Sequence, residues 1–152
     1  MSKIEVKVMK LSHFDVGYSL PTYASLGAAG ADVRAMLGPN EKIIIKPGMR
    51  TLIPTGLIFE IPLGYEIQVR PRSGLSLKTS LMILNSPGTI DSDYRGEVKI
   101  IMGNLGIEDQ VVCHGDRVAQ LVLSAVNLFE FVEVDEIQET KRGVGGFGST
   151  GI

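Results

Sequence analysis

The sequence predicts an all-β fold. Short runs rich in Ile, Val, Leu, Thr and Tyr alternate with Gly and Pro, of which the chain of 152 residues has 18 and 7. Residues 41–74, EKIIIKPGMRTLIPTGLIFEIPLGYEIQVRPRSG, place turn signals at Pro47-Gly48 and Pro62-Leu63-Gly64. Turns about every ten residues are typical of a β-sandwich or β-barrel. With 44% hydrophobic residues the chain can bury a sizeable core, and its length indicates one domain.

The individual elements follow from local patterns. Residues 1–10, MSKIEVKVMK, alternate apolar and charged side chains, which predicts a first strand. Residues 128–137, LFEFVEVDEI, alternate apolar and acidic side chains, as a half-buried strand does. The best helix candidate is the short, loosely periodic segment 73–84, SGLSLKTSLMIL. Further strands are expected at residues 42–46, 50–61, 65–71, 97–105 and 116–126.

The chain ends in a segment that cannot pack as a core element. Residues 142–152, RGVGGFGSTGI, include five Gly. Low complexity begins near Glu139, so we expect an all-β domain, either a sandwich or a barrel, at residues 1–138 and a flexible arm at residues 139–152. The side chains available on this arm are those of Arg142, Phe147, Ser149 and Thr150.

The composition excludes several classes of function. A formal net charge of −2 speaks against a broad nucleic-acid groove. No apolar run reaches the length of a membrane span, and the N-terminus lacks a secretory signal, so we expect a cytoplasmic protein with no membrane partner. The single Cys113 excludes an internal disulfide. Cys113, His13 and His114 have no known zinc-ligand spacing, and a strand end or turn suits Cys113 and His114.

The segment AAGADVRA, residues 28–35, surrounds Asp32 and Arg34 with small residues. Small residues let the backbone approach another group closely, and here they bring a carboxylate with them. The segment therefore predicts either a close contact with a ligand or, alternatively, a tight strand start.

The segment PRSGLS, residues 71–76, places Arg72, Ser73 and Gly74 at the expected helix start. Exposed amides at a helix N-terminus, together with a hydroxyl and a guanidinium, suit a phosphate. It is not a Walker A loop, because no Gly-Lys-Ser/Thr follows the glycine. The alternative is an N-cap Ser beside a surface Arg.

The segment NSPGTIDSDYRGE, residues 85–97, is the most informative. In an extended chain Asp91 and Asp93 share one face, where two like charges cost stability unless a cation or a bound water uses them. The Pro87-Gly88 turn exposes backbone polar groups that could read a flat base, with Asn85 adding a paired donor and acceptor. The alternative is a charged hairpin tip. The clustered side chains are Asp91, Asp93, Tyr94, Arg95 and Glu97.

The segment HGDRVAQLV, residues 114–122, has Asp116 and Arg117 at a turn and then Gln120 within an apolar strand. A Gln among Val, Ala and Leu needs hydrogen-bond partners if it is buried. The alternative is an ion pair at the strand start with an outward-facing Gln.

Together these segments fit a nucleotide polyphosphate with Mg²⁺. Asp32, Asp91 and Gln120 could handle metal-bound or nucleophilic water, and Tyr94 and Phe147 could stack on rings. Phosphates could be bound by Arg72, Ser73, Arg142, Ser149 and Thr150.

In this order and spacing, the five segments resemble the five motifs of the trimeric dUTP diphosphatases (dUTPases). The resemblance runs from AAGADVRA to RGVGGFGSTG, includes KPGMRTLIPTGL, and is most specific in the pair NSPGTIDSDYRGE and PRSGLSLK. It implies a distorted, jelly-roll-like β-barrel of the β-clip type. It also implies a homotrimer with active sites at subunit interfaces, where the arm closes over nucleotide bound at a neighbouring subunit.

The resemblance further implies Mg²⁺-dependent hydrolysis of dUTP to dUMP and diphosphate, which keeps uracil out of DNA and supplies dUMP for dTMP synthesis. Asp91 would be the general base for in-line water attack on the α-phosphorus, and Gln120 would hold the α-phosphate or the water. Asp32 would contact Mg²⁺ through a water in the outer shell. The remaining phosphate contacts would come from Arg72, Ser73, Gly74, Arg142, Ser149 and Thr150.

Specificity is also implied by the resemblance. Tyr94 would pack on the deoxyribose and exclude a 2′-hydroxyl, and Phe147 would stack over the uracil. Cytosine would leave a group unpaired, at roughly 1–3 kcal/mol. Asp116 and Arg117 would be structural, bracing the site or the trimer interface. The uracil edge would be read by Asn85, Gly88, Thr89 and Ile90.

Three alternatives differ in class. The first is a dCTP deaminase on the same general fold, either alone or combined with dUTP hydrolysis, which would need a general acid/base at cytosine C4. The second is a trimeric binding or regulatory module without turnover, which a missing Asp91 or arm would favour. The third is a structural β domain, which explains the strands but none of the five clusters.

Overall fold

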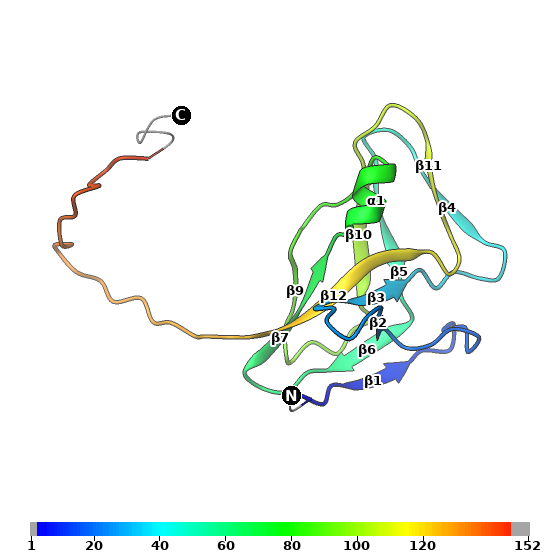
Figure 1. The fold of residues 1–152 in the computed structure, drawn as a ribbon, viewed down its shortest axis with the longest axis horizontal. Coiled ribbons are helices and arrows are strands. Elements are labelled where there is room, and N and C mark those ends of the chain that lie inside the picture. The colour runs from blue at the N-terminus through cyan, green and yellow to red at the C-terminus, as the bar shows by residue number, and fades with distance from the viewer. Residues whose placement is uncertain (1–2, 147–152) are drawn as a thin grey trace.

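Apart from one short helix, the regular elements within residues 3–146 are antiparallel strands, which confirms the all-β prediction. The computed structural model describes residues 3–146 of the chain. In chain order the elements are β1 (Lys7–Lys10), β2 (Thr22–Tyr23), β3 (Ala31–Arg34), β4 (Lys42–Ile45), β5 (Arg50–Pro54), β6 (Leu57–Glu60), β7 (Tyr65–Arg70), α1 (Ser73–Lys78), β8 (Leu81–Ile83), β9 (Gly88–Ile90), β10 (Lys99–Asn104), β11 (Gln110–Cys113) and β12 (Arg117–Ala125) (Figure 1).

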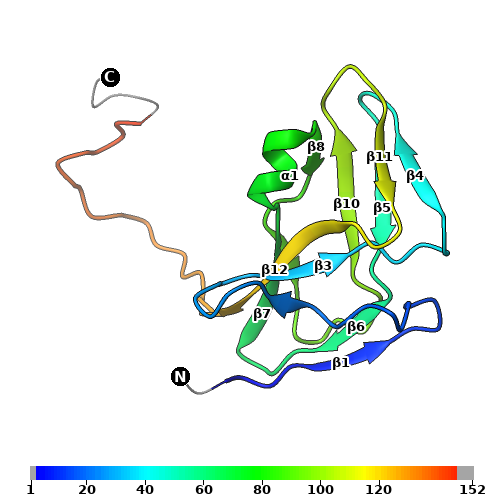
Figure 2. The same cartoon turned by 45° about the vertical axis from the view of Figure 1, so that its right-hand side comes forward.

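The strands form several small sheets around one core. The largest has the order β2-β3-β12-β7-β9, and a second has the order β5-β10-β8. Two ribbons, β1-β6 and β11-β4, complete the arrangement (Figure 2). Because these sheets do not join into a continuous ladder, the fold is an unclosed, jelly-roll-like barrel, as the resemblance implied. No helix within residues 3–146 is long and apolar enough to cross a membrane.

The core draws side chains from every sheet. Among the described residues, two polar ones are also fully buried, and both form hydrogen bonds. The Thr55 hydroxyl donates to the Val98 carbonyl, and the Asn104 amide donates to the carbonyls of Ile45 and Glu108. The largest fully buried apolar side chains are Ile45, Ile53, Leu57, Ile100, Met102, Val33, Val98, Val112 and Val118.

Two predicted elements have different boundaries in the structure. The run 50–61 is divided into β5 and β6, because Gly56 has a positive φ of 67°. The helix predicted over 73–84 ends at Lys78, and Leu81–Ile83 instead forms β8 beside β10. The reason is that Leu81 and Ile83 are buried with the strand period of two.

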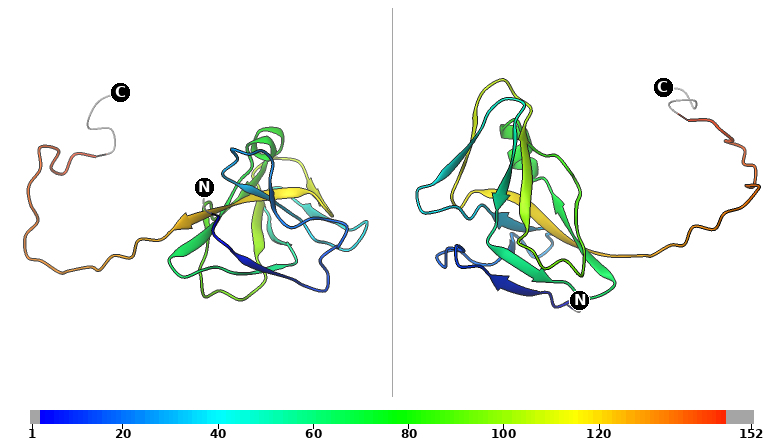
Figure 3. Two further views of the ribbon diagram at one scale, coloured as in Figure 1. Left: turned by 60° about the horizontal axis from the view of Figure 1, so that its bottom comes forward. Right: turned by 180° about the vertical axis from the view of Figure 1, so that it is seen from behind.

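The strand predicted at residues 128–137 is wrong for the chain taken alone. After β12 ends at Ala125, the backbone leaves the body of the protein in every view (Figures 1 and 3). The apolar side chains of this segment are exposed: Leu128 by 92%, Phe131 by 88% and Ile137 by 87%. A period of two forms a stable strand only with a partner, and residues 3–146 provide none for this segment. The domain division at residue 138 remains a prediction.

Candidate active site

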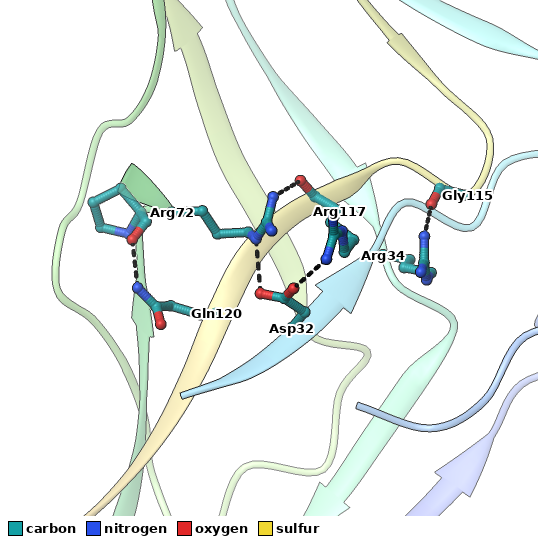
Figure 4. A network of polar contacts seen from close by, with 7 residues as sticks. Asp32, Arg34, Arg72, Gly115, Arg117 and Gln120 are labelled. Atoms are coloured by element: carbon teal, nitrogen blue, oxygen red, sulfur yellow. Dashed lines mark hydrogen bonds and ion pairs between the residues drawn. The ribbon is translucent and has the colours of Figure 1, made fainter. Parts of the chain in front are cut away.

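Asp32 lies at the centre of an ion-pair network on β3. One carboxylate oxygen, Oδ1, accepts a hydrogen bond from Arg72 Nε at 2.7 Å, and the other, Oδ2, accepts one from Arg117 Nη1 at 3.1 Å (Figure 4). The Asp32 side chain is only 19% exposed, so both pairs are partly shielded from water. β3 lies beside β12, with Asp32 directly opposite Gln120, which brings segments far apart in sequence into one place.

Arg72 and Ser73 open the short helix α1. Arg72 occupies the N-cap position without a side-chain cap, and Ser73 is the first helical residue, so the N-cap Ser alternative is wrong. The Arg72 carbonyl accepts the amides of Leu75 and Ser76. As at any helix N-terminus, the first amides have no intrahelical partner, so they remain available to an anion.

Gln120 is partly buried and has the hydrogen bond that its surroundings require. Its Nε2 donates to the Pro71 carbonyl at 2.9 Å, just before Arg72 (Figure 4). Gly30 lies directly against its other end, since a Cβ on Gly30 would overlap Oε1 and lie 3.0 Å from Cδ. The small residues of AAGADVRA therefore permit a close approach between this segment and β12.

These residues line one open groove of about 480 Å³, which we call the cationic groove. Three arginines and one carboxylate give this surface an excess of positive charge. The residues that line the cationic groove are Ala24, Ala28, Ala29, Gly30, Asp32, Arg70, Arg72, Ser73, Gly74, Arg117, Gln120 and Val122.

A second groove, of about 360 Å³, lies beside the segment that follows β9. We call it the Asp91 groove. β9 pairs with β7 so that Gly88 lies opposite Val69, and a Cβ on Gly88 would lie 3.1 Å from the Asn85 amide nitrogen. The residues that line the Asp91 groove are Leu52, Thr89, Ile90, Asp91, Tyr94, Glu97, Val98, Lys99 and Ile101.

Asp91 begins a turn rather than continuing a strand. The Tyr94 amide donates to the Asp91 carbonyl at 3.2 Å, and Arg95 Nη1 donates to the Ser92 carbonyl at 2.7 Å. The expectation that Asp91 and Asp93 share one face of an extended chain is therefore wrong. Asp91 lines the groove, whereas Asp93 is exposed in the turn.

The two grooves share no lining residue within residues 3–146. β7 separates them, because it pairs with β9 along one edge and with β12 along the other. One chain thus brings Asp32, Arg72, Ser73, Gly74 and Gln120 together, but it does not bring them to Asp91 and Tyr94.

The arm contributes only one described candidate. Arg142 is exposed, and its Nε donates to the Gly145 carbonyl at 2.9 Å within a local turn. Phe147, Ser149 and Thr150 lie outside the described residues.

Two arginines at the cationic groove were not assigned a ligand role from the sequence. Arg117 was expected to brace the site or the trimer interface, and its guanidinium reaches Asp32 inside the groove, which is consistent with bracing the site. Arg70, which ends β7 directly opposite Gln120, was not predicted as a site residue. The signal that could have revealed Arg70 is its position immediately before Pro71-Arg72 at the end of an alternating strand. The Asp116 carboxylate, by contrast with Arg117, makes a local contact: it accepts a hydrogen bond from the Cys113 backbone amide at 2.8 Å within a turn.

The side chains of the cationic groove fit a magnesium ion that the protein contacts through a metal-bound water. No group of three His, Cys, Asp or Glu side chains that could enclose a metal is found among the described residues. Both Asp32 oxygens already accept an arginine hydrogen bond, but each retains a lone pair for a metal-bound water. Mg²⁺ keeps several waters and is commonly held by substrate phosphates, so Asp32 suits an outer-shell contact.

Comparisons with known proteins all match one family. The dUTPase family model matches residues 17–151. A deoxyuridine 5′-triphosphate nucleotidohydrolase of Bdellovibrio bacteriovorus is 57% identical, covering 99% of both chains, and one of Sinorhizobium medicae is 51% identical, covering 97% of this chain and 92% of that one.

Among solved structures, a mutant dUTPase of Staphylococcus bacteriophage 80alpha with dUpNHpp superposes with a TM-score of 0.82. The two sequences are 26% identical, and the match covers 99% of this chain and 100% of the phage chain. The family match spans both grooves and most of the arm, and the fold matches over nearly the whole chain. This chain belongs to the dUTPase family.

Proposed function

We propose that the protein is a dUTP nucleotidohydrolase that converts dUTP and water into dUMP and diphosphate. The observation that carries the proposal is the cationic groove, where Arg72, Ser73 and Gln120 surround an Asp32 whose charge is balanced by two arginines. The two nucleotidohydrolases at 57% and 51% identity support the same activity.

The cationic groove suits the phosphate chain of a nucleotide. Guanidinium groups bind phosphate oxygens with two parallel hydrogen bonds, and the amides at Ser73 and Gly74 add donors without an intrahelical partner. These groups are already in place, so they can stabilise the charge that develops on the leaving diphosphate with little reorganisation. Gln120 is fixed by Pro71 and Gly30 and would hold the α-phosphate or the attacking water.

The chemical step uses Asp91 as general base. Asp91 accepts a proton from a water whose oxygen attacks the α-phosphorus in line. A bond forms between that oxygen and phosphorus while the bond from the α-phosphorus to the bridging oxygen breaks, and diphosphate leaves. In-line attack requires the water and the leaving group on opposite sides of the phosphorus.

The separation of the grooves supports a homotrimer. Since Asp91 and the cationic groove do not meet within one chain, a complete site requires groups from at least two subunits. The exposed segment 128–137 supports the same conclusion, because its apolar side chains need cover that residues 3–146 do not supply. Sedimentation equilibrium should give three times the mass of one chain.

Magnesium would bind mainly to the three phosphates, with Asp32 contacting one of its waters. When bound, the ion lowers the negative charge of the phosphate chain. The residues of the chain that orient this arrangement are Asp32, Arg72 and Arg117, through the two ion pairs already present.

Base and sugar would be recognised in the Asp91 groove. The segment Asn85–Ile90 can offer backbone groups and the Asn85 amide to the uracil edge, and a side chain at Gly88 would crowd that amide. Tyr94 would pack on the deoxyribose. From the arm, Arg142, Ser149 and Thr150 would reach the γ-phosphate and Phe147 would stack on uracil.

The exposed single Cys113 suits a cytoplasmic location, where thiols stay reduced.

A product assay tests the proposal directly. The protein is incubated with Mg²⁺ and, separately, dUTP, dCTP, dTTP and UTP, and the products are resolved by ion-exchange chromatography. We expect dUMP and diphosphate from dUTP alone. Conversion of dCTP to dUTP or dUMP would show a deaminase instead, and no turnover of any nucleotide would show a binding module.

A further inference from the structure

Glu97 anchors the segment that carries Tyr94. This segment, residues 91–98, crosses from β9 in the largest sheet to β10 in the three-stranded sheet. The Glu97 side chain is only 12% exposed, and its Oε1 accepts hydrogen bonds from the Gly56 amide and from His13 Nε2, each at 2.9 Å. Lys99 Nζ lies 3.4 Å from Oε2. One carboxylate therefore joins the segment to the turn between β5 and β6 and to the loop after β1.

The Tyr94 ring depends on the backbone next to Glu97. Its hydroxyl donates to the Glu97 carbonyl at 3.2 Å. Its ring lies against Gly96, where a Cβ would overlap the hydroxyl and lie 2.5 Å from Cζ. Because Tyr94 is 45% exposed, the surrounding side chains do not enclose it. The ring is thus placed by residues 96 and 97, and these are placed by the Glu97 carboxylate.

The Glu97 carboxylate keeps its charge despite its burial. Burial favours the neutral acid and by itself raises the pKa of Glu97. The Gly56 amide, His13 and Lys99 together outweigh that effect, so the pKa of Glu97 lies below its ordinary value. Since charged hydrogen bonds are stronger than neutral ones, the ionised side chain holds its partners firmly.

We propose that Glu97 is a positioning residue for sugar discrimination, which holds the Tyr94 ring where it excludes a 2′-hydroxyl. The inference rests on the proposed function and adds a residue that acts through the placement of the Tyr94 ring. If Glu97 only stabilised the fold, its loss would lower the melting temperature without changing the preference for the deoxyribose.

The test compares kcat/KM for dUTP and for UTP, with Mg²⁺ present. Glu97→Ala should lower the dUTP-to-UTP ratio by about tenfold or more, which corresponds to roughly 1.4 kcal/mol. Glu97→Gln should keep the ratio within about threefold, because an amide oxygen still accepts the Gly56 hydrogen bond. Ile45→Val, in the distant core of β4, is the matched control for lost stability and should leave the ratio unchanged.

A double-mutant cycle shows whether Glu97 acts through Tyr94. Tyr94→Ala should lower the ratio, and adding Glu97→Ala should lower it no further. An unchanged ratio in a folded Glu97→Ala protein would overturn the inference, as would a fully additive double variant. If Glu97→Ala does not fold, His13→Ala removes one partner of the carboxylate and should lower the ratio partially, whereas an unchanged ratio counts against the inference.

The wild-type protein separates the two proposals. Hydrolysis of dUTP to dUMP and diphosphate supports the proposed function whatever the Glu97 variants do. A wild-type protein that hydrolyses neither nucleotide defeats the proposed function and the role of Glu97 together.

Discussion

Gly30 lies so close to Gln120 that a Cβ on Gly30 would overlap the Gln120 side-chain oxygen. Gly30 belongs to the loop before β3, and Gln120 belongs to β12, where its amide nitrogen is held by the Pro71 carbonyl. The terminal amide of Gln120 is therefore confined on both sides, at its nitrogen and at its oxygen, which suits a residue that holds a phosphate or a water.

Gly30→Ala should displace Gln120 and lower kcat/KM for dUTP by about tenfold to a hundredfold, because small misplacements of binding groups are costly in catalysis. Gly27→Ala is the matched control, since a Cβ there would meet nothing within 4 Å. Steady-state kinetics on both variants checks this expectation. Equal activity in the two would show that the position of Gln120 does not matter.

Asp91→Asn should retain nucleotide binding and lose about a hundredfold to ten-thousandfold in kcat, because an amide cannot accept the proton of the attacking water. Binding of a non-hydrolysable dUTP analogue by calorimetry, together with kcat, separates the two effects. Asp93→Asn is the control: Asp93 is exposed in the same turn and does not line the Asp91 groove, so near wild-type turnover is expected. Full activity in Asp91→Asn would exclude Asp91 as the base.

Truncation after Lys141 should leave a folded assembly with kcat reduced about a hundredfold or more, because it removes every phosphate-binding candidate of the arm. Circular dichroism and sedimentation report the fold and the assembly, and product formation reports kcat. A rate equal to that of the full chain would refute closure by the arm.

The melting temperature should fall as the pH is lowered through about 4 and below. The Gly17 amide and then His114 lower the pKa of Asp15, and the pKa of Glu97 is also lowered. A carboxylate with a lowered folded pKa contributes stability that is complete above its unfolded pKa and is lost as pH falls through the folded one. Thermal melts between pH 7 and pH 3 measure this, and Glu97→Gln should show a weaker acid dependence. A melting temperature that is flat over this range would contradict the prediction.

Local sequence patterns predicted much of the fold because strand period and turn residues act over a few positions. β4, β7, β10 and β12 lie where alternation and turn signals placed them. The end of α1 could not be predicted, since Leu81–Ile83 becomes a strand only through its pairing with β10, about twenty residues later in sequence.

The candidate site was predictable as a set of residue types but not as an arrangement. Asp32 meets Arg72 and Arg117, which are 40 and 85 positions away, and no local period encodes such pairs. Gln120 differs from Asp32, because a polar residue in an apolar strand predicts that its side chain has a hydrogen-bond partner. In the structure that partner is the Pro71 carbonyl. The resemblance implied active sites at subunit interfaces, but the division into two grooves was not predicted, since it depends on β7 lying between β9 and β12.

The alternating segment 128–137 has a consequence for the newly made chain, before any assembly. An exposed segment of Phe, Leu and Val that has the two-residue period of a strand could stack on copies of itself and form fibrils. Here acidic residues interrupt every short apolar stretch, at Glu130, Glu133, Asp135 and Glu136. Repulsion between these charges would oppose in-register stacking of identical segments. A different surface that carries positively charged side chains could still bind the segment. The same carboxylates would thus oppose aggregation of the unassembled subunit until the oligomer forms.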